Sequence, residues 1–216
     1  GTVGSQAGQY GGFAVVGSKL YFTANDPANG LELRVLNTTT NAVTMVDINS
    51  GSGDSFPNQS GRSFSPSRDI IAVGSKLYFS AKDATNDYEL RVLDTTNNTF
   101  TTVDINAGSA GSNAGTFGFA AVGSKLYFTS DDDTTRRELR VLDSTNNTFS
   151  TVNTYPVPAN AGIGESGGIT VVGNKLYFSA ADPTYGYELC VFDTTTNTLS
   201  TVDINSGSGH SIAGQY

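Results

Sequence analysis

The dominant feature of this sequence is a repeat of about 50 residues that occurs four times. The words GSKLYFTA, GSKLYFSA, GSKLYFTS and GNKLYFSA place a Lys at positions 19, 76, 125 and 175. A Glu-Leu pair follows each Lys after 13 residues, and an Asp or Asn stands 15 residues after each Glu. Offsets this constant indicate one supersecondary structure used four times.

Within each repeat, apolar residues alternate with a period of two, which is typical of strands. In the first repeat the pattern predicts strands at Phe13–Val16, Leu20–Ala24, Leu31–Leu36 and Val43–Ile48. Gly17 and Ser18 predict a tight turn between the first two, because Gly tolerates positive φ. Four short antiparallel strands in a repeat of this length are typical of a β-propeller blade.

The sequence therefore predicts an all-β fold, a β-propeller of four antiparallel blades of four strands each. The blades form either a four-bladed ring or a ring in which they are pooled with those of another chain. We expect one repeat domain over residues 1–216. Its blades are predicted at about residues 11–50, 69–107, 117–154 and 168–206, with a long connection at 51–68.

Composition excludes several classes of function. The chain of 216 residues has 12 Lys and Arg against 20 Asp and Glu, a net charge of −8. Such an acidic chain is not expected to bind nucleic acid, whose phosphates need clustered cations. No apolar run is long enough to span a membrane. The single Cys excludes an intramolecular disulfide, and any catalytic His would have to be His210.

The repeat KLYFSA-x-D-x(3)-G-x-EL-x(3)-D-x-T…VDIN-x-GSG-x-S resembles the ELWxxDGT-repeat family of bacterial secreted and surface proteins. The resemblance covers essentially the whole chain and is strongest over Lys175–Ser211. It implies a β-propeller-like array that is secreted or displayed at the cell surface, with a signal peptide already removed. The family's Trp is replaced here by Arg34, Arg91, Arg140 and Cys190, so the resemblance concerns fold and location more than activity.

Four acidic residues occupy equivalent loops, each seven residues after the repeat Lys: Asp26, Asp83, Asp132 and Asp182. In one interpretation each Asp, with loop carbonyls and the repeat Glu, binds Ca²⁺. In the other, each Asp caps its own loop by accepting hydrogen bonds from backbone N–H groups. The second is favoured because the loops lack D-x-D-x-D spacing, and no other cofactor is expected. Three aromatic residues beside these loops are candidates for stacking on sugars: Tyr88, Tyr185 and Tyr187.

Three repeats carry a Glu-x-Arg pair on the third strand: Glu32/Arg34, Glu89/Arg91 and Glu138/Arg140. Residues two apart on a strand share a face, so these pairs predict a salt-bridge or hydrogen-bond ladder between blades, which is favoured over the alternative of a ligand site. Cys190 replaces the fourth Arg and is expected to be a small packed residue rather than a nucleophile.

Adjacent aromatic residues recur on the second strand as Tyr21-Phe22, Tyr78-Phe79, Tyr127-Phe128 and Tyr177-Phe178. Because neighbours on a strand face opposite ways, we expect Phe in a core and Tyr against the adjacent blade. The connection at residues 54–69 is longer than its counterparts, and exceptional loops often carry function or contact another chain.

The predicted function is a non-enzymatic, extracellular or cell-surface binding or adhesion module, lectin-like, with glycans or cell-surface polymers as partners. The alternative is a self-assembling structural protein of a surface layer, sheath or filament. It is favoured by the likeness of residues 1–10, GTVGSQAGQY, to residues 207–216, GSGHSIAGQY. An enzyme is not expected, because no nucleophile elbow, metal cluster or phosphate loop is present.

Overall fold

The structure is a computed structural model that describes most of the chain. It covers residues 4–8, 12–51, 53–55, 70–85, 87–108, 110–132, 137–152, 154, 157–158, 161–207 and 209–211. Most of the long connection predicted at 51–68, from residue 56 onward, therefore lies outside the described residues. Among the described residues, no helix has the length and apolar character that a membrane span needs.

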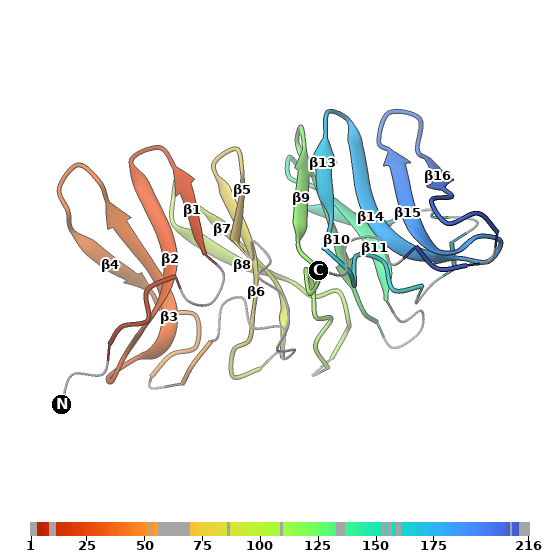
Figure 1. Ribbon diagram of the computed structural model, residues 1–216. Helices are drawn as coiled ribbons and strands as arrows, with labels where there is room; N and C mark the ends of the chain where they lie inside the picture. Colours follow the sequence, from red (N-terminus) through yellow and green to blue (C-terminus); the bar gives the residue numbers. More distant parts are fainter. Residues whose placement is uncertain are drawn as a thin grey trace. The chain divides into compact units, whose positions relative to one another are not determined.

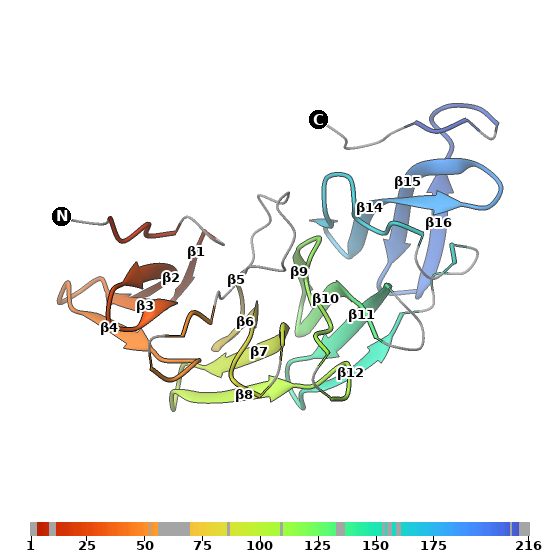
Figure 2. The ribbon, with the colours of Figure 1, turned by 90° about the horizontal axis from the view of Figure 1, so that it is seen from below.

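The described residues form four separate antiparallel sheets, each with its four strands paired in chain order (Figures 1 and 2). Blade 1 contains β1 (Phe13–Val16), β2 (Lys19–Asp26), β3 (Gly30–Asn37) and β4 (Val43–Val46). Blade 2 contains β5 (Ile70–Val73), β6 (Lys76–Ala81), β7 (Glu89–Asp94) and β8 (Thr99–Val103). Blade 3 contains β9 (Phe119–Val122), β10 (Lys125–Ser130), β11 (Glu138–Asp143) and β12 (Thr148–Thr151). Blade 4 contains β13 (Thr170–Val172), β14 (Lys175–Asp182), β15 (Gly186–Asp193) and β16 (Thr198–Val202).

Each blade has two tight turns at one end, which we call the turn end. Gly17, between β1 and β2, has a φ of 58°, and Asn41, between β3 and β4, has a φ of 55°. Gly and Asn are the residues that adopt this left-handed conformation at least cost. Because the strands are antiparallel, the β2–β3 loop and the segment leading to the next blade, the connector, lie at the other end, the loop end.

The two sides of a blade differ in composition, as the alternation predicts. In blade 1 one side carries Leu20, Phe22 and Ala24 (the Phe face), and the other carries Tyr21 and Thr23 (the Tyr face). The equivalent sides of the other blades take the same names.

The chain divides into two compact units, residues 1–115 with blades 1 and 2 and residues 116–216 with blades 3 and 4. In the first unit, Tyr21 and Leu33 from the Tyr face of blade 1 join one core cluster with Leu77 and Phe79 from the Phe face of blade 2. The prediction that Phe lies in a core and Tyr packs against the adjacent blade is confirmed here.

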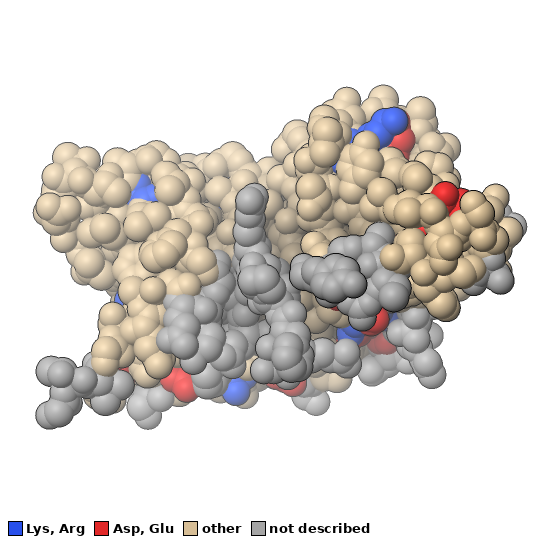
Figure 3. All heavy atoms as spheres, in the orientation of Figure 1, with Lys and Arg blue, Asp and Glu red and all other residues tan. Residues whose placement is uncertain are grey.

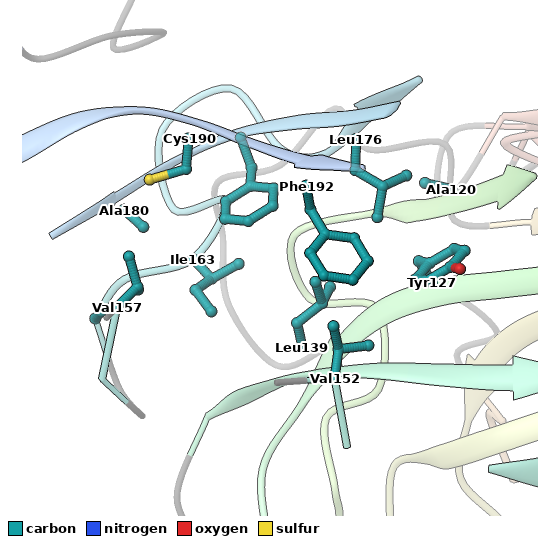
Figure 4. Packing of buried hydrophobic residues seen from close by; sticks show 12 residues of the cluster. Ala120, Tyr127, Leu139, Val152, Val157, Ile163, Leu176, Ala180, Cys190 and Phe192 are labelled. Carbon is teal, nitrogen blue, oxygen red and sulfur yellow. The ribbon is translucent and has the colours of Figure 1, made fainter. Parts of the chain in front are cut away.

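The second unit has the same type of core (Figure 4). Tyr127 and Leu139 from the Tyr face of blade 3 pack with Phe178 and Phe192 from the Phe face of blade 4. Cys190 is fully buried in this cluster and is thus a packed residue, as predicted.

All four predicted strands of blade 1 are present, but β2 and β3 extend beyond their predicted bounds and the fourth strand is shorter than predicted. β4 ends at Val46 rather than at Ile48. The reason is that the backbone N–H of Ile48 donates to the Glu32 carboxylate instead of to a neighbouring strand. This bond marks the point where the blade ends and the connector begins.

Candidate functional site

The loop end of each blade contains the predicted acidic residues, and in blade 1 that acid holds its own loop. Oδ1 of Asp26 accepts hydrogen bonds from the backbone N–H groups of Ala28 and Asn29, both at 2.9 Å. Its Oδ2 forms an ion pair with Arg34. The Asn29 side chain is the main cause that lowers the pKa of Asp26, so the carboxylate is ionised.

Blades 2 and 3 repeat this arrangement. Oδ1 of Asp83 accepts from the backbone N–H of Thr85 at 2.7 Å, and Oδ2 lies 2.8 Å from the guanidinium of the fully buried Arg91. Asp132 forms the corresponding ion pair with Arg140. Arg140 also lies 3.3 Å from Glu138 of its own blade. Each of the three Arg residues therefore pairs with acids of its own blade, and the predicted ladder of Glu-x-Arg pairs between blades is wrong. The cause is the β2–β3 register, which places Arg34 opposite Phe22, within reach of its own loop.

Blade 4 keeps the acid without the arginine. Oδ1 of Asp182 accepts from the backbone N–H groups of Thr184 and Tyr185, and Oδ2 accepts from the hydroxyl of Thr201 at 2.7 Å. Burial opposes ionisation of Asp182, but these hydrogen bonds outweigh it and lower its pKa. Burial raises the pKa of Cys190 to about 11, so its thiol is not a nucleophile near neutral pH.

These contacts decide how the four Asp residues act in the structure. Asp26, Asp83 and Asp182 each cap the loop of their own blade, as the second interpretation states. Asp132 pairs with Arg140, and residues 133–136 of its loop lie outside the described residues. The described residues contain no group of three or more His, Cys, Asp and Glu side chains that could hold a metal ion. Calcium binding at Asp26, Asp83, Asp132 or Asp182 stays a prediction, and an ion there has to compete with hydrogen bonds already formed.

The repeat Glu holds the connector. Glu32 is fully buried, and its carboxylate accepts from the backbone N–H of Ile48 at 3.0 Å and of Ser55 at 3.1 Å. Glu89 does the same for Ile105 at 3.0 Å and Ser112 at 2.7 Å. Burial is the main cause that raises the pKa of both, to about 7 for Glu32.

The same connector also holds the blade that follows it. The carbonyl of Ser55 accepts from the backbone N–H of Lys82 in blade 2 at 3.1 Å. In the second unit the carbonyl of Ala161 accepts from Ala181 of blade 4 at 2.8 Å. The connector is thus a clamp between two blades. Sequence reasoning missed this role, although an Ile and a Ser stand 16 and 23 residues after three of the four repeat Glu residues, Glu32, Glu89 and Glu188.

Blade 3 uses a different residue for this purpose. Arg137 is 6% exposed, and its guanidinium lies 3.0 Å from Asp131 and 3.3 Å from Glu165 of the following connector. It also lies over the ring of Phe117, 4.6 Å from the centroid. This residue too was missed, and its signal was the replacement of Leu or Tyr before the repeat Glu by Arg.

The three tyrosines differ in how far they are engaged. The backbone carbonyl of Tyr88 accepts from Asn113 at 3.0 Å, and Lys82 lies 5.8 Å from its ring centroid. The hydroxyl of Tyr187 donates to the carbonyl of Gly162 at 2.6 Å, and its backbone N–H donates to Nδ1 of His210. Tyr185 is 38% exposed at the tip of its loop and is therefore the most available of the three.

The first unit also contains a hollow of about 480 Å³ away from the acidic loops. Its apolar floor includes Val35, Met45 and Leu93, and Lys19 and Asn37 contribute polar groups.

Comparison with known proteins identifies the fold. No protein-family model matches the sequence, and no curated protein is similar to it. Solved structures are similar: a puromycin hydrolase has a TM-score of 0.56 at 16% identity, over 86% of this chain and 27% of its own. The fold is that of a β-propeller.

Two further structures agree. A puromycin-hydrolyzing peptidase of Mycobacterium tuberculosis has a TM-score of 0.56 at 13% identity, over 89% of this chain and 28% of its own. Dipeptidyl peptidase 4 of Porphyromonas gingivalis has a TM-score of 0.57 at 10% identity, over 88% and 25%. The chain thus spans only about a quarter of the length of these proteins, and the likeness concerns the propeller fold alone.

Proposed function

We propose that this β-propeller is a non-enzymatic binding module of the cell exterior, and that its loop end recognises glycans or other cell-surface polymers. The observation that carries the proposal is a constant frame beneath variable loops. Asp and Glu recur in fixed places in all four blades and Arg in three of them, whereas the loops between Asp and Glu read PANGL at 27–31, ATNDY at 84–88 and PTYGY at 183–187. Rigid scaffolds with variable loops are a common basis of binding sites.

The blade 4 loop is the best candidate within that surface. Its backbone is fixed by the two hydrogen bonds to Asp182, so the exposed Tyr185 projects from a rigid base. A fixed, exposed aromatic ring can stack on a sugar ring at low entropic cost, and the exposed Thr184 beside it can bond a hydroxyl. Similar weak sites on other blades would add through avidity.

Two further observations support a non-catalytic role outside the cell. The buried Cys190 is unreactive, and the loop carboxylates already accept hydrogen bonds or ion pairs from the protein. The resemblance to the ELWxxDGT-repeat family supports a secreted or surface location.

A glycan array, read with and without Ca²⁺, tests this proposal. We expect a family of related glycans to bind, and Tyr185→Ser to weaken binding about tenfold, which corresponds to about 1.4 kcal/mol. Thr145→Ser, at the exposed turn end of blade 3, is the matched control and should bind normally. An array without hits in either condition contradicts the proposal, and loss of binding on removing Ca²⁺ supports the calcium prediction.

Self-assembly is a second candidate function, because a specific observation favours it. Six of the eight large hydrophobic side chains exposed in the described part of the chain lie on or beside two blade faces. Three are on the Phe face of blade 1, and two are on the Tyr face of blade 4, which Ile204 extends at the start of the following connector. Apolar surface of this kind marks interaction sites. Light scattering across concentration should show a mass above the 22.5 kDa of one chain.

A further inference from the structure

Neighbouring blades within each unit are joined in the same way. The Tyr face of blade 1 packs on the Phe face of blade 2, and the first strands β1 and β5 are in contact. Blades 3 and 4 repeat this joint, with β9 against β13. Tyr21 lies beside Thr95 in the β7–β8 turn of blade 2, and Tyr127 lies beside the equivalent Thr194 of blade 4. A Tyr face is therefore the surface that receives the Phe face of the next repeat.

The Tyr face of blade 4, the last repeat, is exposed. Val172, Val202 and Ile204 are 62%, 43% and 58% exposed. Val152, which takes the place of Val202 in blade 3, is only 7% exposed. Tyr177 is half-buried, whereas its equivalent Tyr127 is fully buried. Blade 4 thus presents the same apolar surface that the other joint covers.

The Phe face of blade 1, the first repeat, is exposed in the complementary way. Phe13, Val15 and Val43 are 58%, 62% and 59% exposed. Ile70, which takes the place of Phe13 in blade 2, is 4% exposed because blade 1 covers it. The ring of Phe13 lies 5.8 Å from the ring of Phe22 in its own blade, and Gly8 of the preceding segment lies against it.

The connector between two blades bonds to the blade before it and to the blade after it, and residues near the two ends of the sequence each make one of these two sets of bonds. Ser211 donates its N–H and hydroxyl to the carbonyl of Tyr187, as Ser55 does to Leu31, and these are bonds to the blade before. The carbonyl of Ser5 accepts from the N–H of Asn25 at 2.8 Å, and this is a bond to the blade after. The following residues also match, QAGQY after Ser5 and IAGQY after Ser211.

Blade 4 also has an unsatisfied group at this clamp. Glu188 is fully buried, and its Oε2 accepts from Ile204. Its Oε1 has no hydrogen-bond partner among the described residues. In blade 1 the same oxygen accepts from Ser55, whose carbonyl is held by the next blade. A buried acceptor without a donor is costly, and the clamp of blade 4 lacks the donor that the clamp of blade 1 has.

We propose that the Tyr face of blade 4 in one copy of this chain receives the Phe face of blade 1 in a second copy. In this joint the carbonyl of Ser211 replaces that of Ser5 as acceptor for the N–H of the partner copy's Asn25. The inference rests on the second function proposed above. A second copy is the matching partner because the two faces reproduce the internal joint position by position. The contact is head-to-tail, so it produces rings or filaments.

Charge variants on the two faces test the joint by sedimentation over a range of concentrations. Val172→Glu and Phe13→Glu should each raise the dissociation constant at least about tenfold, because a charge is buried in an apolar joint. Both positions are exposed in the single chain, so folding should be unaffected. Thr195→Glu, at an exposed turn of blade 4, adds the same charge outside the face and should associate normally.

Cysteine trapping identifies the partner. In the internal joint, Val16 and Ala72 pack against one cluster, and these are the equivalents of Val172 and Val15. Mixing the Val15→Cys and Val172→Cys variants under oxidising conditions should give a disulfide-linked dimer, whereas either variant alone should give little. The native Cys190 is buried and does not interfere.

The outcomes separate the two proposals. A protein that stays monomeric at all concentrations overturns both self-assembly and this joint. Association that none of the face variants weakens overturns the joint while self-assembly stands. Val15→Cys and Val172→Cys are also combined in one chain. A disulfide within that chain, with none in the mixture of single variants, overturns the second copy as partner.

Discussion

Glu32 and Glu89 are buried, and the side chain of each accepts hydrogen bonds from backbone N–H groups of the connector. Burial makes ionisation costly, and the hydrogen bonds only partly offset this cost. Replacing the buried residue would leave the N–H of Ile48 without its acceptor and remove one of the two acceptors of the Ser55 N–H, the other being the carbonyl of Leu31. The same residue therefore stabilises the joint between blades and makes it sensitive to pH.

The pKa of Glu32 is raised from 4.5 to about 7 in the folded chain. Between these values the folded state binds a proton that the unfolded state has released. The free energy of unfolding should therefore fall as pH rises from 4.5 to about 7, by up to about 3 kcal/mol, and change little above. The shift of Glu89 has the same sign. Urea unfolding between pH 4 and 8 measures this slope.

Glu32→Gln is the control for this pH dependence. The amide cannot ionise, so the variant should show a shallower slope than the natural chain. Its stability should be lower at pH 5, because the amide nitrogen, unlike the hydroxyl oxygen of the protonated carboxyl group, cannot accept a hydrogen bond from Ile48 or Ser55. A slope equal to that of the natural chain would show that Glu32 does not titrate in this range.

At the scale of elements, the connector depends on close packing between an Asn side chain and a Gly of the same segment. Nδ2 of Asn49 donates to the carbonyl of Asp54 at 3.3 Å. A Cβ on Gly53 would lie 2.6 Å from that same Nδ2. Asn205 and Gly209 repeat the arrangement after blade 4. The DIN and GSG segments of the repeat therefore pack against each other in the connector.

This fit predicts a non-additive pair of substitutions. Gly53→Ala should displace the Asn49 side chain and lose its hydrogen bond, at a cost of about 1 kcal/mol. Asn49→Ala should cost a similar amount. In the Asn49→Ala background, Gly53→Ala should cost almost nothing, because no amide remains to displace. Unfolding of the four variants in a double-mutant cycle checks this, and additive effects would contradict it.

The elements themselves could be predicted from the sequence, because strand alternation is local and the repeat supplies four copies of the same pattern. The side-chain partners could not. Arg34 was expected to face another blade, but strand register turns it to Asp26. The connector N–H groups of Ile48 and Ser55 donate to Glu32 because the fold brings residues 16 and 23 positions later back to it. Linear spacing shows that such positions are related but not which groups meet.

At the scale of the whole chain, the exposed apolar faces favour association between copies, whereas the acidic net charge opposes it. On the surface in view in Figure 3, charged side chains are few, and the proposed joint is formed by aliphatic and aromatic groups. Each chain nevertheless carries a net charge of −8, so two copies repel each other at long range. Salt screens this repulsion over a Debye length of about 10 Å at 0.1 M and leaves apolar contact intact.

Self-association should therefore strengthen as salt is added. We expect the dissociation constant to fall several-fold between about 0.02 and 0.5 M NaCl, because the Debye length shortens over this range and the repulsion between two chains is screened. Sedimentation equilibrium at the two concentrations measures the change. A joint formed by ion pairs would behave in the opposite way and weaken with salt. The direction of the change thus distinguishes an apolar blade-to-blade contact from an association through the charged groups of the loop end.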